Sequence, residues 1–148
     1  MNAVNFFSKQ EKEAIKAAVK EAELSTSGEI RVHIDNHCKG DVMDRAAWWF
    51  AKLDMHQTEL RNGVLFYLAV KDRKFAILGD AGINAVTPED FWDQIKEKML
   101  ARFSEGAFAA GLSEGILMAG QALKEHFPYQ DGDVNELSDD ISFGGDKA

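Results

Sequence analysis

The feature that most constrains the fold is a continuous apolar run at residues 64–70, Val-Leu-Phe-Tyr-Leu-Ala-Val. Polar turn residues bound it on both sides, Arg61-Asn62-Gly63 before it and Lys71-Asp72-Arg73 after it. A strand that lacks polar alternation must be covered on both of its faces. Residues 74–79 follow the short turn and are predicted to form its antiparallel hairpin partner. The chain therefore requires a sheet with helices on both sides.

A second strand is predicted at residues 29–35, where Ile30, Val32 and Ile34 alternate with polar residues. A helix that begins at the potential cap Asp41 separates this strand from the apolar run. A strand, a helix and a strand in succession form a right-handed crossover, so these two strands should be parallel.

Three further helices are predicted around the strands. Ser8 and Glu11 form a capping box that opens the first. Thr87 and Pro88 are typical of a helix start, with Thr87 as cap. The last helix spans residues 108–127. The element order α-β-α-β-β-α-α predicts an α/β fold, a three-layer α/β/α sandwich with a small mixed sheet.

Details of the helices extend this prediction. Gly111 and Gly115 share one face, which predicts that the last helix lies close to the sheet. Trp49 and Trp92 fall on apolar helix faces and are predicted to pack in the core. Residues 80–84 are predicted to be a glycine-containing loop.

Length and charge limit the organisation and the partners. The 148 residues suit one domain, predicted at residues 1–127, followed by an acidic tail at 128–148 that is flexible or draped over the domain. A net charge of -8 repels a phosphate backbone, which argues against nucleic acid as a partner. The sequence shows no signal peptide and no membrane span, so the expected location is the cytoplasm. The single cysteine, Cys38, excludes an intrachain disulfide.

Several kinds of chemistry lack their sequence signals. No nucleophile elbow, P-loop, dinucleotide fingerprint or His-Glu-x-x-His motif is present. The spacing of the four histidines does not favour a zinc site, and each is expected to be solvated or locally hydrogen-bonded. Residues 131–136 imitate the start of an EF-hand loop, but the sixth position is Glu136 rather than glycine and the twelfth is Ser142 rather than glutamate, so no EF-hand is predicted.

One constellation of oxygen donors survives. The predicted strand directions bring Glu29, Asn62 and Asp80 to one edge of the sheet, with Asn84 and the loop at residues 54–58 nearby. Carboxylate, amide and carbonyl oxygens suit a hard cation such as calcium or magnesium.

Two alternatives to this site stay open. Arg61 lies at the same edge and could neutralise a carboxylate or contact an anion, while Asp80 and Asn62 could simply hold turns. Asp41 and Asp44, at the other end of the first strand, form a rival cation site, although both are also expected as helix-cap residues.

The chain resembles the TPM domain family, which takes its name from thylakoid lumen, photosystem repair and levamisole-receptor-modulator proteins. The resemblance extends over about residues 8–127. The motifs that carry it are Thr26-Ser27-Gly28-Glu29-Ile30-Arg31-Val32, Met55-His56-x-Thr58, Arg61-Asn62-Gly63-Val64-Leu65, Asp72-Arg73-Lys74-Phe75-Ala76, Leu78-Gly79-Asp80-x-Gly82-Ile83 and Phe103-xx-Gly106-x-Phe108-xx-Gly111-xxx-Gly115-Ile116.

The resemblance implies a three-layer α/β/α sandwich, calcium binding, and the acid phosphatase activity attributed to plant members. Relatives often carry a glutamate where this chain has Asn84. In a phosphatase, Asp80 would be the nucleophile or a metal ligand, and Arg61 and His56 would clamp the phosphate.

Three functions are consistent with the sequence. The first is a calcium-binding module that assists the assembly or maintenance of a protein partner. The second is a metal-assisted acid phosphatase. The third is a structural interaction domain that uses the acidic tail at 128–148 as a contact segment.

Overall fold

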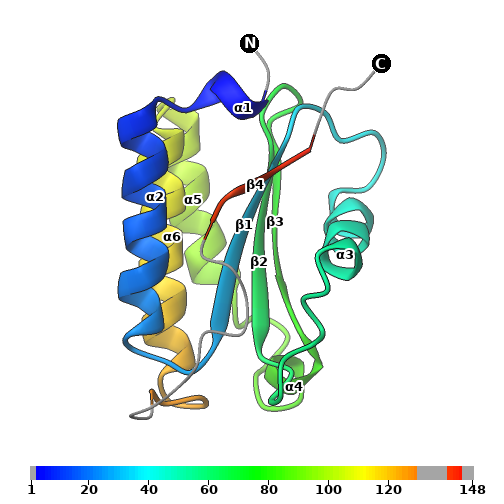
Figure 1. Cartoon of the computed structure of the whole chain (residues 1–148), viewed down its shortest axis with the longest axis vertical. Helices are drawn as coiled ribbons and strands as arrows, with labels where there is room; N and C mark the ends of the chain where they lie inside the picture. Colours follow the sequence, from blue (N-terminus) through cyan, green and yellow to red (C-terminus); the bar gives the residue numbers. More distant parts are fainter. Residues whose placement is uncertain (1–2, 130–139, 145–148) are drawn as a thin grey trace.

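The computed structural model describes residues 3–129 and 140–144. Within them the chain forms six helices and four strands around a central sheet (Figure 1). The elements are, in chain order, α1 (Ala3–Phe6), α2 (Lys9–Glu23), β1 (Glu29–Asp35), α3 (Val42–Lys52), β2 (Gly63–Ala69), β3 (Lys74–Gly79), α4 (Ala81–Asn84), α5 (Asp93–Ser104), α6 (Phe108–Leu123) and β4 (Ser142–Phe143).

The sheet has the strand order β3-β2-β1-β4. β1 and β2 are parallel, with Glu29 opposite Gly63 and Asp35 opposite Ala69. β2 and β3 are antiparallel, with Val64 opposite Gly79. The three predicted strands and their relative directions are therefore confirmed.

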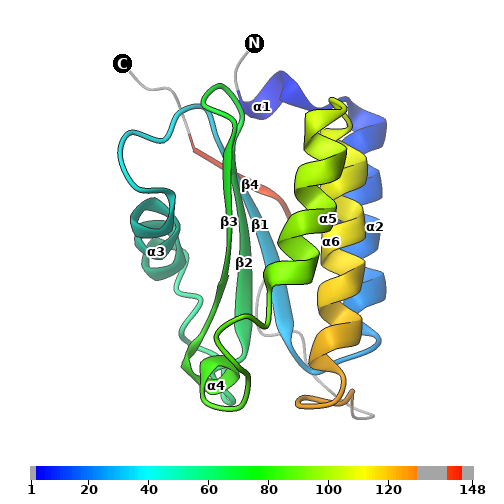
Figure 2. The same cartoon turned by 180° about the vertical axis from the view of Figure 1, so that it is seen from behind.

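Helices cover both faces of the sheet, so the predicted three-layer sandwich is confirmed. Helices α2, α5 and α6 lie on one face, and α3 lies alone on the other (Figures 1 and 2). β2 is buried along its whole length, because it lies between these layers in the middle of the sheet. The continuous apolar run thus has the position that its composition requires.

Two apolar clusters follow from the alternation of side chains along the strands. Ile30, Val32 and Ile34 point to the face of α2, α5 and α6 and belong to the larger cluster. Leu65 and Tyr67 of β2 belong to the smaller cluster, under α3. His33 is out of phase with Ile30, Val32 and Ile34 and lies on the α3 face, as predicted.

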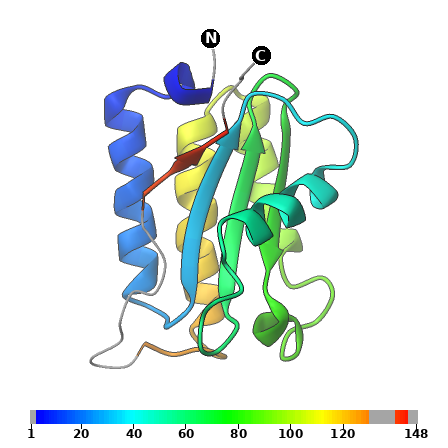
Figure 3. The ribbon, with the colours of Figure 1, turned by 45° about the vertical axis from the view of Figure 1, so that its right-hand side comes forward.

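The fourth strand was not predicted. Ser142 and Phe143 form β4 in parallel with β1, opposite His33 and Ile34, and extend the sheet beyond β1 (Figure 3). The amide of Gly144 continues the pairing by donating to the carbonyl of Ile34 at 2.9 Å. Of the two behaviours expected of the tail, the described part is draped over the domain. The EF-hand-like stretch at residues 131–136 lies outside the described residues.

The predicted helix start at Thr87 and Pro88 is wrong. Residues 89–92 form turns, and α5 begins only at Asp93. The hydroxyl of Thr87 does not cap a following turn but donates back to the carbonyl of Ile83 at 2.8 Å. This bond ties Thr87 to the end of α4, and turns at residues 89–92 separate it from α5.

The prediction of a plain loop at residues 80–84 is also wrong. Ala81–Asn84 is the single helical turn α4. Asp80 is its N-cap, and its carboxylate accepts from the amide of Ala81 at 2.8 Å.

The small residues of α6 face helices rather than the sheet, which corrects the prediction for Gly111 and Gly115. A Cβ at Gly111 would lie 2.6 Å from the ring of Phe103, and one at Gly115 would lie 2.5 Å from the sulfur of Met99. Both contacts are on α5, so the glycines allow α5 and α6 to pack closely.

The two tryptophans differ from the prediction in part. Trp92 is buried in the larger cluster but precedes α5 instead of lying on it. Trp49 is only half-buried and packs against the smaller cluster with its indole N–H in a polar contact.

In the part of the chain that the structure describes, no helix has the length and apolarity needed to cross a membrane.

Candidate functional site

Backbone hydrogen bonds join the predicted oxygen donors at one edge of the sheet, which we call the Asp80 edge and define by Glu29, Asn62, Asp80 and Asn84. The amide of Glu29 donates to the carbonyl of Asn62 at 3.2 Å, and the amide of Asp80 donates to the carbonyl of Gly63 at 2.9 Å. The amide of Asn84 donates to the carbonyl of Asp80 at 3.1 Å. The strand directions therefore bring these four residues together as the sequence predicted.

Asp80 and Arg61 form a bidentate ion pair at this edge. The guanidinium Nε lies 2.7 Å from Oδ2 of Asp80, and Nη2 lies 2.8 Å from Oδ1. The carboxylate side chain is 6% exposed, whereas the arginine side chain is 50% exposed. The pair has the fork geometry that makes arginine–carboxylate contacts strong, and of the alternatives left open for Arg61, the described structure shows the neutralising one.

The two asparagines use their amide N–H groups to hold the local backbone. The Nδ2 of Asn62 donates to the carbonyl of Ser27 at 3.3 Å, and that of Asn84 donates to the carbonyl of Gly79 at 3.2 Å. Asn62 is buried and Asn84 is exposed. Each residue therefore has a turn-holding role, and its side-chain oxygen is the atom that remains to accept a bond or bind a cation.

Close backbone approach fixes the shape of this edge. A Cβ at Gly82 would overlap the carbonyl oxygen of Leu60 and would lie 2.6 Å from that of Arg61. The amide of Gly82 also donates to the carbonyl of Arg61 at 2.8 Å. Arg61 itself has a positive φ of 51°. Glycine at position 82 is therefore a steric requirement for seating α4 against this loop.

Electrostatics keep Asp80 ionised. Burial acts to raise its pKa, but the hydrogen bonds from Arg61 and the Ala81 amide, together with the charges of Arg61 and His56, outweigh burial and lower it. His56 is exposed, so its contribution is that of a nearby charge. The Asp80 carboxylate is thus ionised and held by the charge of Arg61.

The Asp80 edge offers oxygen ligands to a metal ion, but few of them are carboxylates. Among residues 3–129 and 140–144, no three His, Cys, Asp or Glu side chains form a group that could hold a metal ion. A cation at this edge would have to combine the carboxylates of Asp80 and Glu29 with amide and carbonyl oxygens. Asp41, of the rival site, caps α3 by accepting from the amides of Met43 and Asp44 at 2.8 and 3.1 Å.

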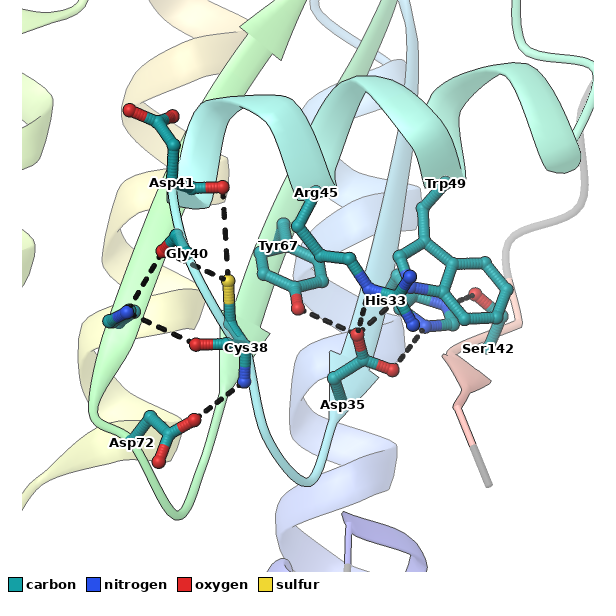
Figure 4. A network of polar contacts seen from close by, with 11 residues as sticks. His33, Asp35, Cys38, Gly40, Asp41, Arg45, Trp49, Tyr67, Asp72 and Ser142 are labelled. Carbon is teal, nitrogen blue, oxygen red and sulfur yellow. Dashed lines mark hydrogen bonds and ion pairs between the residues drawn. The ribbon is translucent and has the colours of Figure 1, made fainter. Parts of the chain in front are cut away.

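A second polar cluster, which the sequence analysis missed, lies on the α3 face at the end of β1 (Figure 4). We call it the Asp35 cluster. Its members are His33, Asp35, Arg45, Trp49, Tyr67 and Ser142.

Asp35 is the centre of this cluster. Its carboxylate accepts from the Tyr67 hydroxyl at 2.6 Å, from the Trp49 indole at 2.9 Å and from Nε of Arg45 at 3.3 Å. Burial acts to raise its pKa, but the hydrogen bonds from His33, Tyr67 and Trp49 prevail and lower it to about 2. The pKa of Tyr67 is raised, first by burial and then by the hydrogen bond to Asp35. The cluster therefore holds a buried carboxylate and a neutral phenol at neutral pH.

His33 connects Asp35 to the C-terminal strand. Its Nε2 lies 3.3 Å from Oδ1 of Asp35, and its Nδ1 lies 2.6 Å from the hydroxyl oxygen of Ser142. Burial lowers the pKa of His33, partly opposed by Asp35, so the imidazole is neutral at pH 7. Asp35 is ionised and cannot donate, so the single ring proton must lie on Nε2. Nδ1 is then an acceptor, and Ser142 donates to it.

Part of the Asp35 cluster has a sequence signal. His33 and Asp35 are two apart on one strand and so share a face, and Tyr67 is opposite His33 in the sheet register. Polar residues on the covered face of a strand point to a buried network. Ser142 carries no comparable signal, because a two-residue strand far along the chain has no periodicity to detect.

The comparisons with known proteins agree on one family. A TPM domain family model matches residues 1–122. The BA42 protein from the psychrophilic bacterium Bizionia argentinensis has a similar structure, with a TM-score of 0.90, 46% sequence identity, and coverage of 95% of this chain and 97% of that chain.

More distant structures share the fold. An N-terminal domain of a protein from P. gingivalis has a TM-score of 0.68 at 21% identity, with coverage of 83% of this chain and 80% of that one. The N-terminal domain of the cg2496 protein from Corynebacterium glutamicum has a TM-score of 0.60 at 14% identity, with coverage of 92% and 80%. No curated protein matches this chain. The family model and the BA42 structure together show that the chain belongs to the TPM domain family.

Proposed function

We propose that this TPM domain binds a divalent cation, with calcium as the best-suited ion, at the Asp80 edge. The observation that carries the proposal is the pairing of a buried, ionised carboxylate with an arginine that is half exposed. A guanidinium with this exposure can turn into water without any change in the core. The Asp80 carboxylate would then be left in need of another positive charge.

The ligands that support the proposal are oxygen atoms, which calcium prefers. Asp80 supplies a carboxylate, and Asn62 and Asn84 supply amide oxygens whose N–H groups are already bound to backbone carbonyls. Glu29 is buried at the same edge and supplies a second carboxylate. With so few carboxylates the affinity should be modest, with a Kd of about 0.1–1 mM.

A calorimetric titration with calcium chloride tests this proposal. Asp80→Asn should abolish binding, and Arg61→Gln should tighten it by about tenfold, because the cation no longer competes with the guanidinium. Arg102→Gln is the matched control, since Arg102 and Glu114 form the same bidentate pair at 2.7 and 3.1 Å between α5 and α6. Equal Kd values for Arg61→Gln and Arg102→Gln, or unchanged binding by Asp80→Asn, would contradict the proposal.

A melting scan gives a second readout. Calcium at about 100 times its Kd should stabilise the native state by about 2.7 kcal/mol, and a chelator should reverse the shift. A role in the assembly or maintenance of other proteins would then depend on a protein partner that recognises the calcium-loaded domain.

Metal-assisted phosphatase activity is the second candidate. The observation in its favour is again the Arg61–Asp80 pair, because a cation on Asp80 would leave the guanidinium free to bind a phosphoryl group. The bound metal would polarise a phosphoryl oxygen. Phosphate release from p-nitrophenyl phosphate by the wild type and by Asp80→Ala tests this, and equal rates would remove Asp80 from the reaction.

A further inference from the structure

Ser142, His33 and Asp35 lie in line as hydroxyl, imidazole and carboxylate. The hydroxyl oxygen of Ser142 is 2.6 Å from Nδ1 of His33, and Nε2 of His33 is 3.3 Å from Asp35 (Figure 4). This is the order of contacts by which a base and a carboxylate activate a serine nucleophile, with the two ring nitrogens of the histidine in exchanged roles.

The reaction requires a shielded base and an accessible nucleophile, and the burial of the three residues fits this requirement. His33 and Asp35 are buried, at 0% and 4% exposure, whereas Ser142 is only partly buried. The neutral imidazole with its proton on Nε2 presents a lone pair at Nδ1 to the hydroxyl. The indole of Trp49 stacks on the imidazole with ring centroids 3.7 Å apart, which excludes water from one face of the base.

A donor for a developing oxyanion is also present. The Nε–H of Arg31 is buried and has no hydrogen-bond partner within the residues that the structure describes. Arg31 lies two residues before His33 on the same face of β1, and the parallel pairing of His33 with Ser142 places it level with Asp140, whose charge acts on the guanidinium. A buried, unpaired donor is costly unless a ligand pairs with it.

We propose that Ser142 is a nucleophile for small carboxylic esters, with His33 as its base, Asp35 as the positioning carboxylate and Arg31 as the oxyanion donor. This activity uses no residue of the Asp80 edge and does not rest on the cation proposal.

The reaction balances with water as the co-reactant. The hydroxyl oxygen of Ser142 bonds to the ester carbonyl carbon while its proton passes to Nδ1 of His33. The bond from that carbon to the alcohol oxygen breaks, and His33 returns the proton to the leaving alkoxide. Water then attacks the acyl-serine by the same route and releases the carboxylic acid.

A fluorophosphonate probe tests the nucleophile directly, because the Oγ–P bond forms as fluoride leaves. Peptide mass spectrometry of the full chain, with chelator present, should find the label on Ser142. The exposed Ser104 of α5, which donates only to the carbonyl of Ala101 in the described structure, is the internal control. Ser142→Ala should abolish labelling, and Ser104→Ala should leave it unchanged.

If Ser142 only held β4 against β1, its labelling rate would not depend on the protonation of His33. The labelling rate of the wild type should fall at acidic pH, because protonated His33 cannot act as a base. Burial lowers the pKa of His33, so the fall should lie to the acid side of its usual value. His33→Gln should label at least about tenfold more slowly, with folding verified by circular dichroism. p-Nitrophenyl acetate should be turned over by the wild type and not by Ser142→Ala. Equal labelling of Ser142 and Ser104, or a rate that does not fall with acidity at any pH at which the protein stays folded, would overturn the proposal.

Discussion

The hydroxyl of Tyr67 donates to the carboxylate of Asp35 across the parallel β1–β2 pair, at 2.6 Å. Both groups are buried, so neither can exchange its partner for water without a change in the structure. A buried hydrogen bond to a charged acceptor contributes more to stability than a neutral one. The pair therefore links the apolar β2 to the polar face of β1.

We expect Tyr67→Phe to lower the free energy of unfolding by roughly 1.5–3 kcal/mol, the range for a hydrogen bond to a charged group. Denaturation in urea measures this change. Tyr129→Phe is the matched control, because Tyr129 is 42% exposed and should lose almost nothing. Equal midpoints for the two variants would contradict the stabilising role of the Tyr67–Asp35 bond.

Stability should fall in two steps as the solution becomes acidic. The folded pKa of His33 lies below its usual 6.5, so the unfolded chain takes up this proton first and stability declines from about pH 6.5 downward. The folded pKa of Asp35 is lowered from 3.8 to about 2, so its contribution is present above pH 3.8 and is lost as pH approaches 2.

Unfolding free energies measured from about pH 8 down to about pH 2 check these steps. His33→Gln should lose the decline that begins near pH 6.5 and retain the one near pH 4. A pH dependence identical to that of the wild type would show that His33 does not titrate on unfolding.

At the Asp80 edge, Gly82→Ala should be among the most damaging small substitutions. Its Cβ would overlap the carbonyl oxygen of Leu60, so α4 and the preceding loop would have to separate. We expect a loss of at least about 2 kcal/mol, together with loss of calcium binding. Gly106→Ala is the control, because a Cβ there meets nothing within 4 Å and only the φ of 81° is strained, at a cost of about 1 kcal/mol.

Gly144→Ala should detach the C-terminal strand. A Cβ at Gly144 would overlap Oδ1 of Asp35 and lie 3.2 Å from the Trp49 ring. The fluorescence of Trp49 should shift to longer wavelength as water reaches the indole. Truncation after residue 139 removes the same strand and should give the same shift. A spectrum of Gly144→Ala that matches the wild type would show that β4 tolerates the extra methyl group.

The sequence predicted the parts of the fold that depend on local periodicity. The alternation in residues 29–35 and the apolar run that follows determine β1 and β2, and Asp41 caps α3 as expected. The predicted helix start at Thr87 was wrong because a cap signal consists of only a few residues. The hydroxyl of Thr87 instead donates to the Ile83 carbonyl of the preceding helical turn, and sequence spacing does not show this contact.

The candidate sites were predictable to different degrees. Glu29, Asn62 and Asp80 could be brought together because strand direction alone determines which residues share an edge. The pairing of Ser142 with His33 could not, since the two residues are separated by 109 positions and two residues carry no strand pattern. Gly111 and Gly115 predicted that another element packs closely against α6, but they could not identify that element, which is α5. The domain boundary at residue 127 stays a prediction.

The pairing of β4 with β1 also has a consequence for synthesis and refolding. β2 borders β1 on one side, and the strand that borders it on the other is Ser142–Phe143, which is synthesised long after β1. Until those residues leave the ribosome, β1 presents an open edge that can pair with a neighbouring nascent chain. The charges of Arg31 and Asp35 on this strand make such pairing unfavourable, since natural sheets use inward-pointing charges to prevent intermolecular strand addition. We expect the same polar residues to protect the unfinished domain against aggregation and, once β4 has been made, to receive the strand that completes the sheet.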